Sequence, residues 1–440
     1  MLRYYLRLAL LSFKRNPILS TLMVAAIGLG IGVCMTALTV YYLMSIDPIA
    51  SKSDVVYAVQ LDGWDPNEPY PNNTTQENPA PWELTWRDAM TLRESDIAEH
   101  RAAMFVSNFT IVPDDEQVRP FLASARMTDG DFFHLFEVPF LHGGGWDRAA
   151  DDEAQSVIVL SKETNETVFG GENSVGREIR IDDRYFRVIG VLDDWNPVPK
   201  VYDLNNGPFN DSEEVYLPLS LTEPLEVRTG GNTNCWKDEE LNTFQDFLNS
   251  ECVWIQYWVE LTSGTQVREY QAFIDNYVRE QQRLGRFERP LNNRLTNARE
   301  WLDVNEVVQD DNRVLVGLAF MFLAVCLLNT VGLLLAKFAG KAPQVSLRRA
   351  LGASRRAVFV QHLVEIGLIG VAGGLLGLGL AFIGLAGIRS FGGEFEKLAH
   401  LDPVLVALAI AIALFASLAA GVFPTWRACL TPPAAHLKTQ

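Results

Sequence analysis

Cysteine and histidine are scarce in this chain, and the short motifs that carry most catalytic chemistry are missing. Its 440 residues include five cysteines and six histidines, which are scattered along the sequence. The sequence contains no Gly-x-x-x-x-Gly-Lys-Ser/Thr phosphate loop, no His-Glu-x-x-His motif, no Gly-x-Ser-x-Gly elbow and no Cys-x-x-Cys pair. We therefore predict no catalytic residue, no metal site and no cofactor on this chain, and no ATP hydrolysis through a phosphate loop.

Acidic residues are absent from three segments that are rich in lysine and arginine. Segments 1–17, 337–357 and 425–440 hold 4, 6 and 2 basic residues, although the whole chain has 54 acids and a net charge of −17. Lysine and arginine accumulate on the cytoplasmic side of membrane spans. The pattern predicts that both termini and the 337–357 loop are cytoplasmic. The strongly acidic remainder makes nucleic acid an unsuitable partner.

Four long apolar runs lie between the charged parts of the chain. Each is long enough for the ~20 residues that a membrane-spanning helix requires. The predicted spans are 18–45, 314–336, 358–388 and 403–426. The first is too long for the core of a cleaved signal peptide, so we interpret it as an uncleaved anchor. The intervening predicted segments are 1–17, 337–357 and 427–440 in the cytoplasm and 46–313 and 389–402 outside.

Glycines recur at short intervals in two of these spans. The first span contains Gly28, Gly30 and Gly32, and the third contains Gly370, Gly373, Gly374 and Gly377. A Gly-x-Gly-x-Gly run inside a membrane span does not follow a strand, so it does not fit a dinucleotide site. Small residues at such spacing instead predict close helix packing.

The exterior segment 46–313 mixes strand-like alternation with helical periodicity. Strands are predicted at 54–61, 103–112, 121–127, 157–160, 178–181, 185–192, 253–261 and 293–298, and helices at 85–98 and 266–284. We interpret the segment as an α+β domain in which 128–250 is inserted between 46–127 and 251–300. Nine of the ten tryptophans lie here, and we expect most of them to fill the core.

The five cysteines divide between the membrane and the exterior. Cys34, Cys326 and Cys429 lie in or beside apolar runs, where small buried roles are usual. Cys235 and Cys252 both belong to the exterior segment. An oxidising exterior favours a disulfide between these two. The alternative is that they are two separate buried thiols.

The basic loop 337–357 has the signals of a short helix followed by a sharp turn. Pro343 suits the first helical turn, Gly352 suits a C-terminal cap, and Ser354 suits the N-cap of the next helix. One face of this helix is expected to carry Leu347, Ala350 and Leu351. The loop is therefore expected to lie across the membrane surface, where its arginines serve either a partner protein or anionic lipid headgroups.

Residues 341–365, which read KAPQVSLRRALGASRRAVFVQHLVE, resemble the cytoplasmic motif of FtsX/MacB-type ABC transporter permeases. Residues 156–192 are similar to the strand-rich segment of that family, and 423–438 resembles its C-terminal tail. The order of one span, a large exterior domain and three more spans also matches. The resemblance implies an α-helical membrane protein with four transmembrane helices and a large α+β extracytoplasmic domain between the first two. Its lobes would be porter-like (46–127 and 251–300) and Sabre-like (128–250).

The resemblance also implies partners and site residues. The segment expected to contact a separate ABC ATPase, which would hold ATP and Mg²⁺, comprises Gln344, Leu347, Arg348, Arg349, Leu351, Gly352, Ala353, Arg355 and Arg356. Further expected partners are a second, identical or homologous permease chain, membrane lipids, a periplasmic adaptor and an outer-membrane channel. The implied location is the bacterial inner membrane, and no fused ATPase domain is expected.

Some positions depart from the family pattern. Gln344 stands where the family commonly has glutamate, Pro343 precedes it, and His436 replaces a usual alanine in the tail. The docking contact is therefore expected to differ, which favours a heterodimer over a homodimer. Glu365 matches an acid at the start of the third span, where a carboxylate can reach the interface, and we favour a structural or interfacial use over a proton relay.

The family resemblance leaves three functions open. The first is a mechanotransmitting permease for efflux of a peptide, an antibiotic or another amphiphile. The second is an FtsX-like, membrane-anchored sensor or regulator of cell-envelope enzymes. The third is lipoprotein extraction, as in the LolC/LolE branch.

Overall fold

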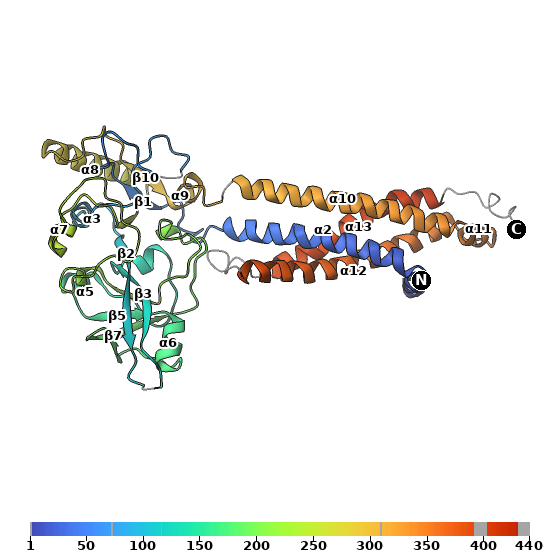
Figure 1. Cartoon of the computed structure of the whole chain (residues 1–440), viewed down its shortest axis with the longest axis horizontal. Coiled ribbons are helices and arrows are strands. Elements are labelled where there is room, and N and C mark those ends of the chain that lie inside the picture. Colours follow the sequence, from blue (N-terminus) through green and yellow to red (C-terminus); the bar gives the residue numbers. More distant parts are fainter. Residues whose placement is uncertain (1, 72–73, 116, 309, 391–402, 430–440) are drawn as a thin grey trace. The chain divides into compact units, whose positions relative to one another are not determined.

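The computed structural model describes residues 2–71, 74–115, 117–308, 310–390 and 403–429 (Figure 1). The chain forms two compact units. One comprises 1–45 together with 308–440, and the other comprises 46–307. The first is called the membrane unit and the second the exterior unit, and each has its own packed interior.

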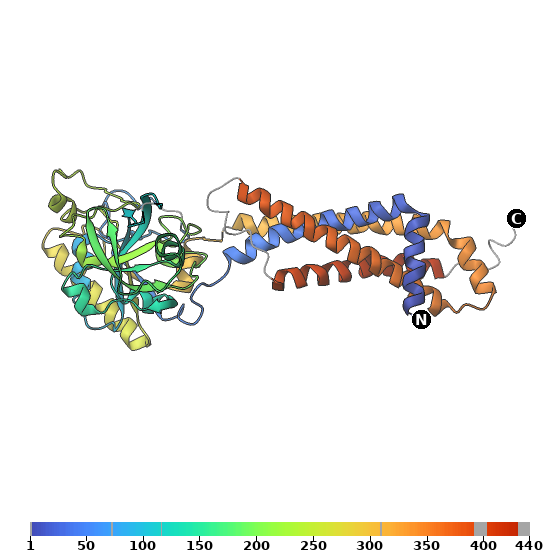
Figure 2. The same ribbon diagram turned by 90° about the horizontal axis from the view of Figure 1, so that it is seen from below.

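The membrane unit contains four helices that are long and apolar enough to cross a bilayer. They are α2 (Pro17–Met44), α10 (Asp310–Gly340), α12 (Arg355–Ser390) and α13 (Pro403–Cys429). They lie side by side in both views (Figure 1, Figure 2). The prediction of four spans is confirmed. The helices are longer than the apolar runs, because a charged residue at a helix end does not interrupt backbone hydrogen bonding.

Two shorter helices belong to the same unit. α1 (Leu2–Arg15) runs across the ends of the long helices (Figure 2), and α11 (Ala342–Ala350) joins α10 to α12. α1 is amphipathic and carries basic residues, as is typical of a helix that lies in the membrane interface. The sequence predicted a cytoplasmic segment at 1–17 without recognising this helix.

Glycines allow α2 and α12 to pack closely. A Cβ atom added to Gly28 would lie 2.8 Å from the side chain of Leu376, and one added to Gly377 would lie 2.8 Å from that of Ile31. Contacts this short are essentially never tolerated, so the helices could not approach each other this closely with larger residues. The predicted packing role of these glycines is confirmed.

The exterior unit is built on a ten-stranded mixed sheet. The strands are β1 (Val56–Gln60), β2 (Arg101–Val112), β3 (Phe121–Thr128), β4 (Phe140–Gly143), β5 (Val157–Leu160), β6 (Glu178–Ile181), β7 (Arg184–Leu192), β8 (Val215–Pro218), β9 (Gln256–Glu260) and β10 (Arg294–Asn297). Their order is β10-β1-β9-β2-β3-β8-β5-β7-β4, with β6 between β2 and β7. All strands predicted from alternation are present, whereas β4 and β8 were not predicted.

The helices of this unit are shorter than the spans. They are α3 (Trp86–Leu92), α4 (Phe132–Leu135), α5 (Arg148–Asp152), α6 (Lys162–Phe169), α7 (Phe244–Leu248), α8 (Gly264–Arg283) and α9 (Ala298–Val304). The helix predicted at 85–98 is wrong in length. The chain tightens after Leu92 into turns in which the amides of Glu94 and Ser95 bond to the carbonyls three residues earlier.

The two predicted lobes contribute adjoining parts of one sheet. The strands β10, β1, β9, β2 and β3 come from 46–127 and 251–300, and β8, β5, β7 and β4 come from 128–250. The two sets meet where β3 runs parallel to β8, with Ala125 opposite Val215, and where β6, also from 128–250, pairs with β2. The assignment of porter-like and Sabre-like lobes stays a prediction.

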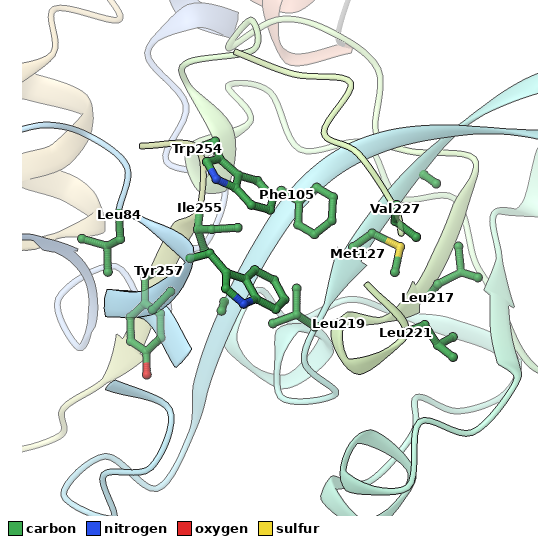
Figure 3. Packing of buried hydrophobic residues seen from close by; sticks show 14 of the residues in the cluster. Leu84, Phe105, Met127, Leu217, Leu219, Leu221, Val227, Trp254, Ile255 and Tyr257 are labelled. Carbon is green, nitrogen blue, oxygen red and sulfur yellow. The ribbon is translucent and has the colours of Figure 1, made fainter. Parts of the chain in front are cut away.

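The core of the exterior unit is rich in aromatic rings. Trp254, which is 1 % exposed, stacks on Trp86 with ring centroids 5.7 Å apart, and Phe105 meets it edge-on at 4.8 Å. Figure 3 shows Trp254 and Phe105 in the same cluster as Leu219 and Val227. The prediction that the tryptophans mostly fill the core is confirmed.

Cys235 and Cys252 form the predicted disulfide. It ties the segment before α7 to the start of the β9 region, next to the backbone bridge between Asn234 and Val253. The alternative of two separate thiols is wrong for this structure.

Replacing both disulfide cysteines with serine is expected to destabilise the exterior unit by about 3 kcal/mol, because the unfolded chain gains the entropy of an open loop. The unit's own melting transition can be followed by tryptophan fluorescence, since nine of the ten tryptophans lie in it. The matched control is Cys34→Ser in the membrane unit. An unchanged exterior transition in the double-serine variant would contradict the prediction.

Candidate functional site

The predicted docking loop folds as a helix that ends in a fixed turn. The amide of Gly352 donates to the carbonyl of Arg349 at 3.1 Å, and the amide of Ala353 donates to that of Arg348 at 3.0 Å. Gly352 has φ +100°, which favours glycine. This pair of bonds is a Schellman cap, as predicted for Gly352.

The next helix starts immediately after this cap. The Ser354 hydroxyl accepts a hydrogen bond from the amide of Ala357 at 3.2 Å and so caps α12. Because one residue separates the two caps, the turn has little freedom. The two caps therefore tie the end of α11 closely to the start of α12.

One side of α11 and its turn is open to solvent. Leu347 is 53 % exposed and Leu351 is 79 % exposed, whereas Val345 on the opposite side is buried against Val358 and Cys429. The other predicted docking residues on the open side are Gln344, Gly352, Arg355 and Arg356. The result is a surface in which two exposed leucines accompany two exposed arginines. We call it the turn surface.

Arg348 and Arg349 point to other parts of the same unit. The guanidinium of Arg348 donates to Gln361 of α12 at 2.6 Å and to the Tyr4 hydroxyl of α1 at 3.1 Å. Arg349 donates to the carbonyl of Cys429 at 3.3 Å. Both side chains are half-buried. These two arginines hold the turn surface against three helices, and Ala353 is likewise half-buried.

Glu365 lies inside the helix bundle. Its side chain is 2 % exposed, and its Oε1 lies 2.8 Å from Nζ of Lys337 and 2.8 Å from Nζ of Lys341. Of the structural and interfacial uses that were expected, this burial favours the structural one, and the role of Glu365 stays a prediction. The two lysines neutralise it in the interior, which offsets much of the cost of burying the carboxylate.

Hydroxyl groups complete this cluster. Ser12 of α1 donates to Glu365, and Lys337 donates to Ser20 of α2 at 2.9 Å. One carboxylate thus joins α12 to α10, α1 and α2. Sequence reasoning missed Lys337 and Lys341 as its partners, although their spacing of four residues places both on one helix face.

A second buried ionic cluster lies in the exterior unit. The Arg126 side chain is 0 % exposed and binds Asp203 at 2.6 Å and also Glu213. Lys200 approaches Glu213 at 3.0 Å. Burial alone would raise the pKa of Glu213, but Arg126 and Lys200 hold it at about 2. All these groups have charged partners, so the cluster is suited to holding the fold.

Two further buried acids lie close to this cluster and to α5. Burial raises the pKa of Glu83 to about 8, and Gln256 donates to this carboxyl at 2.7 Å. Burial and the neighbouring Asp129 likewise raise the pKa of Asp151 to about 8. Asp129 and Asp151 line a polar cavity of about 430 Å³, but backbone amides and Arg93 already bond to them. The absence of a catalytic site on this chain stays a prediction.

These features define a multi-pass membrane protein with a large exterior α+β domain and a surface turn set between two helix caps. Residues 20–277 match the MacB-like periplasmic core domain, and residues 316–433 match the FtsX-like permease C-terminal domain. The chain belongs to the MacB/FtsX-type permease family, as the sequence resemblance predicted. The domain between the first two spans is therefore periplasmic.

Curated relatives share this family. The chain is 23% identical over 312 residues to the pyoverdine export ATP-binding/permease protein PvdT of Pseudomonas aeruginosa, covering 70% of this chain and 41% of that protein. It is 23% identical over 345 residues to the macrolide export ATP-binding/permease protein MacB of Syntrophobacter fumaroxidans, covering 71% and 46%. The chain thus spans less than half the length of these relatives.

Solved structures were matched as well. The periplasmic region of MacB from Actinobacillus actinomycetemcomitans aligns with a TM-score of 0.36 and 14% identity, covering 57% of this chain and 93% of that one.

Proposed function

We propose that this chain is the permease subunit of an ABC-type transporter or mechanotransmitter. A separate ABC ATPase, carrying ATP and Mg²⁺, would dock on the turn surface from the cytoplasm. The observation that carries the proposal is the exposed pair Leu347 and Leu351 on a turn that is capped on both sides. Exposed apolar anchors beside polar and charged side chains are typical of protein interfaces.

The contacts of the turn suggest how motion would spread. ATPase closure would displace α11, and the short turn would pass that displacement to α12. The Glu365 cluster would carry it to α10, α1 and α2. The spans α2 and α10 lead in sequence to the two ends of the periplasmic domain, so their movement would alter that domain. Such coupling requires that ATP favour one packing over another.

The remaining parts of the proposal concern location, assembly and substrate. We place the chain in a bacterial inner membrane with both termini and 337–357 in the cytoplasm, and we expect it to pair with a second permease chain. Because the relatives are named as pyoverdine and macrolide exporters, we propose efflux of a peptide, an antibiotic or another amphiphile, with a periplasmic adaptor and an outer-membrane channel.

Replacing the exposed leucines of the turn surface with acidic residues is expected to abolish ATPase binding. The double variant Leu347→Glu/Leu351→Glu places two carboxylates where apolar contact is proposed, and the ATPase recovered with the tagged chain from native membranes should fall at least tenfold, or about 1.4 kcal/mol. The fold should be unaffected, because both side chains are exposed.

The matched control is Leu284→Glu, which changes a 69 % exposed leucine of the periplasmic domain. It should leave ATPase recovery at the level of the unmodified chain. Equal recovery from the double variant and the control would exclude docking at the turn surface.

Deletion of the chain separates the proposed function from its alternatives. If the chain acts in efflux, the deletion strain should accumulate the exported amphiphile inside the cell. Unchanged efflux together with altered cell-wall hydrolase activity would support a regulator, and retention of lipoproteins in the inner membrane would support lipoprotein extraction.

A further inference from the structure

Two histidines and two acids of the periplasmic domain form a compact group away from the buried ionic clusters. His100 precedes β2, Asp131 and His134 lie at the start of and within α4, and Glu260 ends β9. One ligand atom from each of His100, His134 and Glu260 can be chosen so that all lie within 4.8 Å of one another. The two imidazole rings are 3.8 Å apart between centroids.

The sheet fixes two of these residues against each other. β2 and β9 are antiparallel, with Arg101 opposite Val259, and the amide of Glu260 donates to the carbonyl of His100 at 2.9 Å. The His134 Nε2 then lies 3.0 Å from Oε2 of Glu260. Three donors from separate parts of the chain therefore converge without any change in backbone pairing.

We propose that His100, His134 and Glu260 bind a divalent transition-metal ion of the Zn²⁺ class. Two imidazoles and one carboxylate are a donor set that Zn²⁺ favours, and they leave a fourth position for water. Tetrahedral bonds of about 2.1 Å place donors about 3.4 Å apart, so the present spacing needs only a small contraction.

Asp131 supplies the orienting partner that metal-bound histidines usually have. Its Oδ1 lies 3.1 Å from Nδ1 of His100, which leaves Nε2 of that ring for the metal. Its second oxygen accepts the amide of Arg101 at 3.2 Å, so the carboxylate is itself held in place. The three proposed ligands are therefore accompanied by Asp131, which orients one of them through a hydrogen bond.

The charge of Lys52 lowers the affinity of the site for a metal ion. Its Nζ lies 3.5 Å from Oε1 of Glu260 and donates to the carbonyl of His134 at 2.9 Å. It engages one carboxylate oxygen and leaves Oε2 for the ion, but its charge opposes a cation. Removing this charge should therefore strengthen metal binding.

The test uses the full-length chain in detergent, purified through a tag without histidines and stripped with a chelator. Titration with Zn²⁺ in competition with a chromogenic chelator should show that the chain binds Zn²⁺ through these three residues. Saturating Zn²⁺ should also raise the melting temperature of the tryptophan-reported transition by at least about 3 °C. Titration with Co²⁺ should give the intense visible absorption of a tetrahedral site.

The variants make the result specific. The double variant His100→Ala/His134→Ala should lower affinity at least about 100-fold, Asp131→Asn should lower it about 10-fold to 100-fold, and Lys52→Met should raise it several-fold. His142→Ala, which changes a histidine in β4 outside the group, is the matched control and should leave affinity unchanged. Melting of the metal-free variants should match that of the unmodified chain.

Two results would overturn the proposal. One is the absence of Zn²⁺ binding to the unmodified chain at about 100 µM Zn²⁺, a concentration far above the dissociation constants of structural zinc sites. The other is binding that persists undiminished in the double histidine variant, which would place the metal elsewhere.

Discussion

Replacing Arg126 with methionine is expected to destabilise the periplasmic domain by about 3–5 kcal/mol, because Asp203 and Glu213 would remain buried without their shared guanidinium. For a domain of this size, each kcal/mol corresponds to about 2–4 °C, so the tryptophan-reported melting temperature should fall by roughly 10 °C. The measurement is thermal unfolding of the full-length chain near neutral pH.

The loss should depend on pH in a defined direction. The pKa of Glu213 is held at about 2 in the folded chain against an ordinary value of 4.5. Its contribution is therefore present above 4.5 and is lost as pH falls toward 2. Without Arg126 the acids can protonate, so the variant should lose less stability near pH 4.5 than near neutral pH. Arg279→Met, at an exposed position of α8, is the control. Equal melting of both variants would show that the cluster is unimportant for stability.

Replacing Glu365 with glutamine is expected to weaken the helix bundle by about 3–5 kcal/mol, because Lys337 and Lys341 would lose their counter-ion in the interior. The contact of α1 through Ser12 should weaken at the same time. Trypsin should then cleave faster in the Lys14–Arg15 region between α1 and α2. The measurements are the melting temperature of the membrane unit in detergent and the rate of that cleavage.

A compensated variant tests whether charge balance is the cause. Glu365→Leu combined with Lys337→Met and Lys341→Met removes all three charges, and apolar replacement of a buried ionic cluster is often neutral or stabilising. It should therefore recover most of the lost stability. Arg356→Met, at an exposed position of α12, should change neither measurement. Failure of the triple variant to recover, with a normal control, would indicate that the cluster has a specific geometric role.

The signals that predicted elements correctly were local. The caps at Gly352 and Ser354 follow from residue type and position next to a helix end. The strand β5 was predicted at its observed bounds because apolar residues continue without a break. By contrast, β8 was missed, since a four-residue strand between loops gives too short a pattern.

The candidate site was predictable only in part. The turn surface was identified from its basic motif, but the sequence did not distinguish the exposed Leu351 from the inward-directed Arg348. Long arginine side chains can reach either solvent or a neighbouring helix, and residue type does not decide which. The neighbours Tyr4 and Gln361 settle the direction, and they lie on other helices.

The sequence by itself determined the number of spans, the family, most strands and the capped turn, because composition, periodicity and short-range spacing encode them, and it favoured the disulfide over two separate thiols. Only the tertiary structure decided that Glu365 meets Lys337 and Lys341, that Arg126 neutralises two acids, and that His100 and His134 share a surface with Glu260. These pairings join residues far apart in the chain. They depend on sheet order and helix contacts. The local sequence around each of these residues does not identify its distant partner.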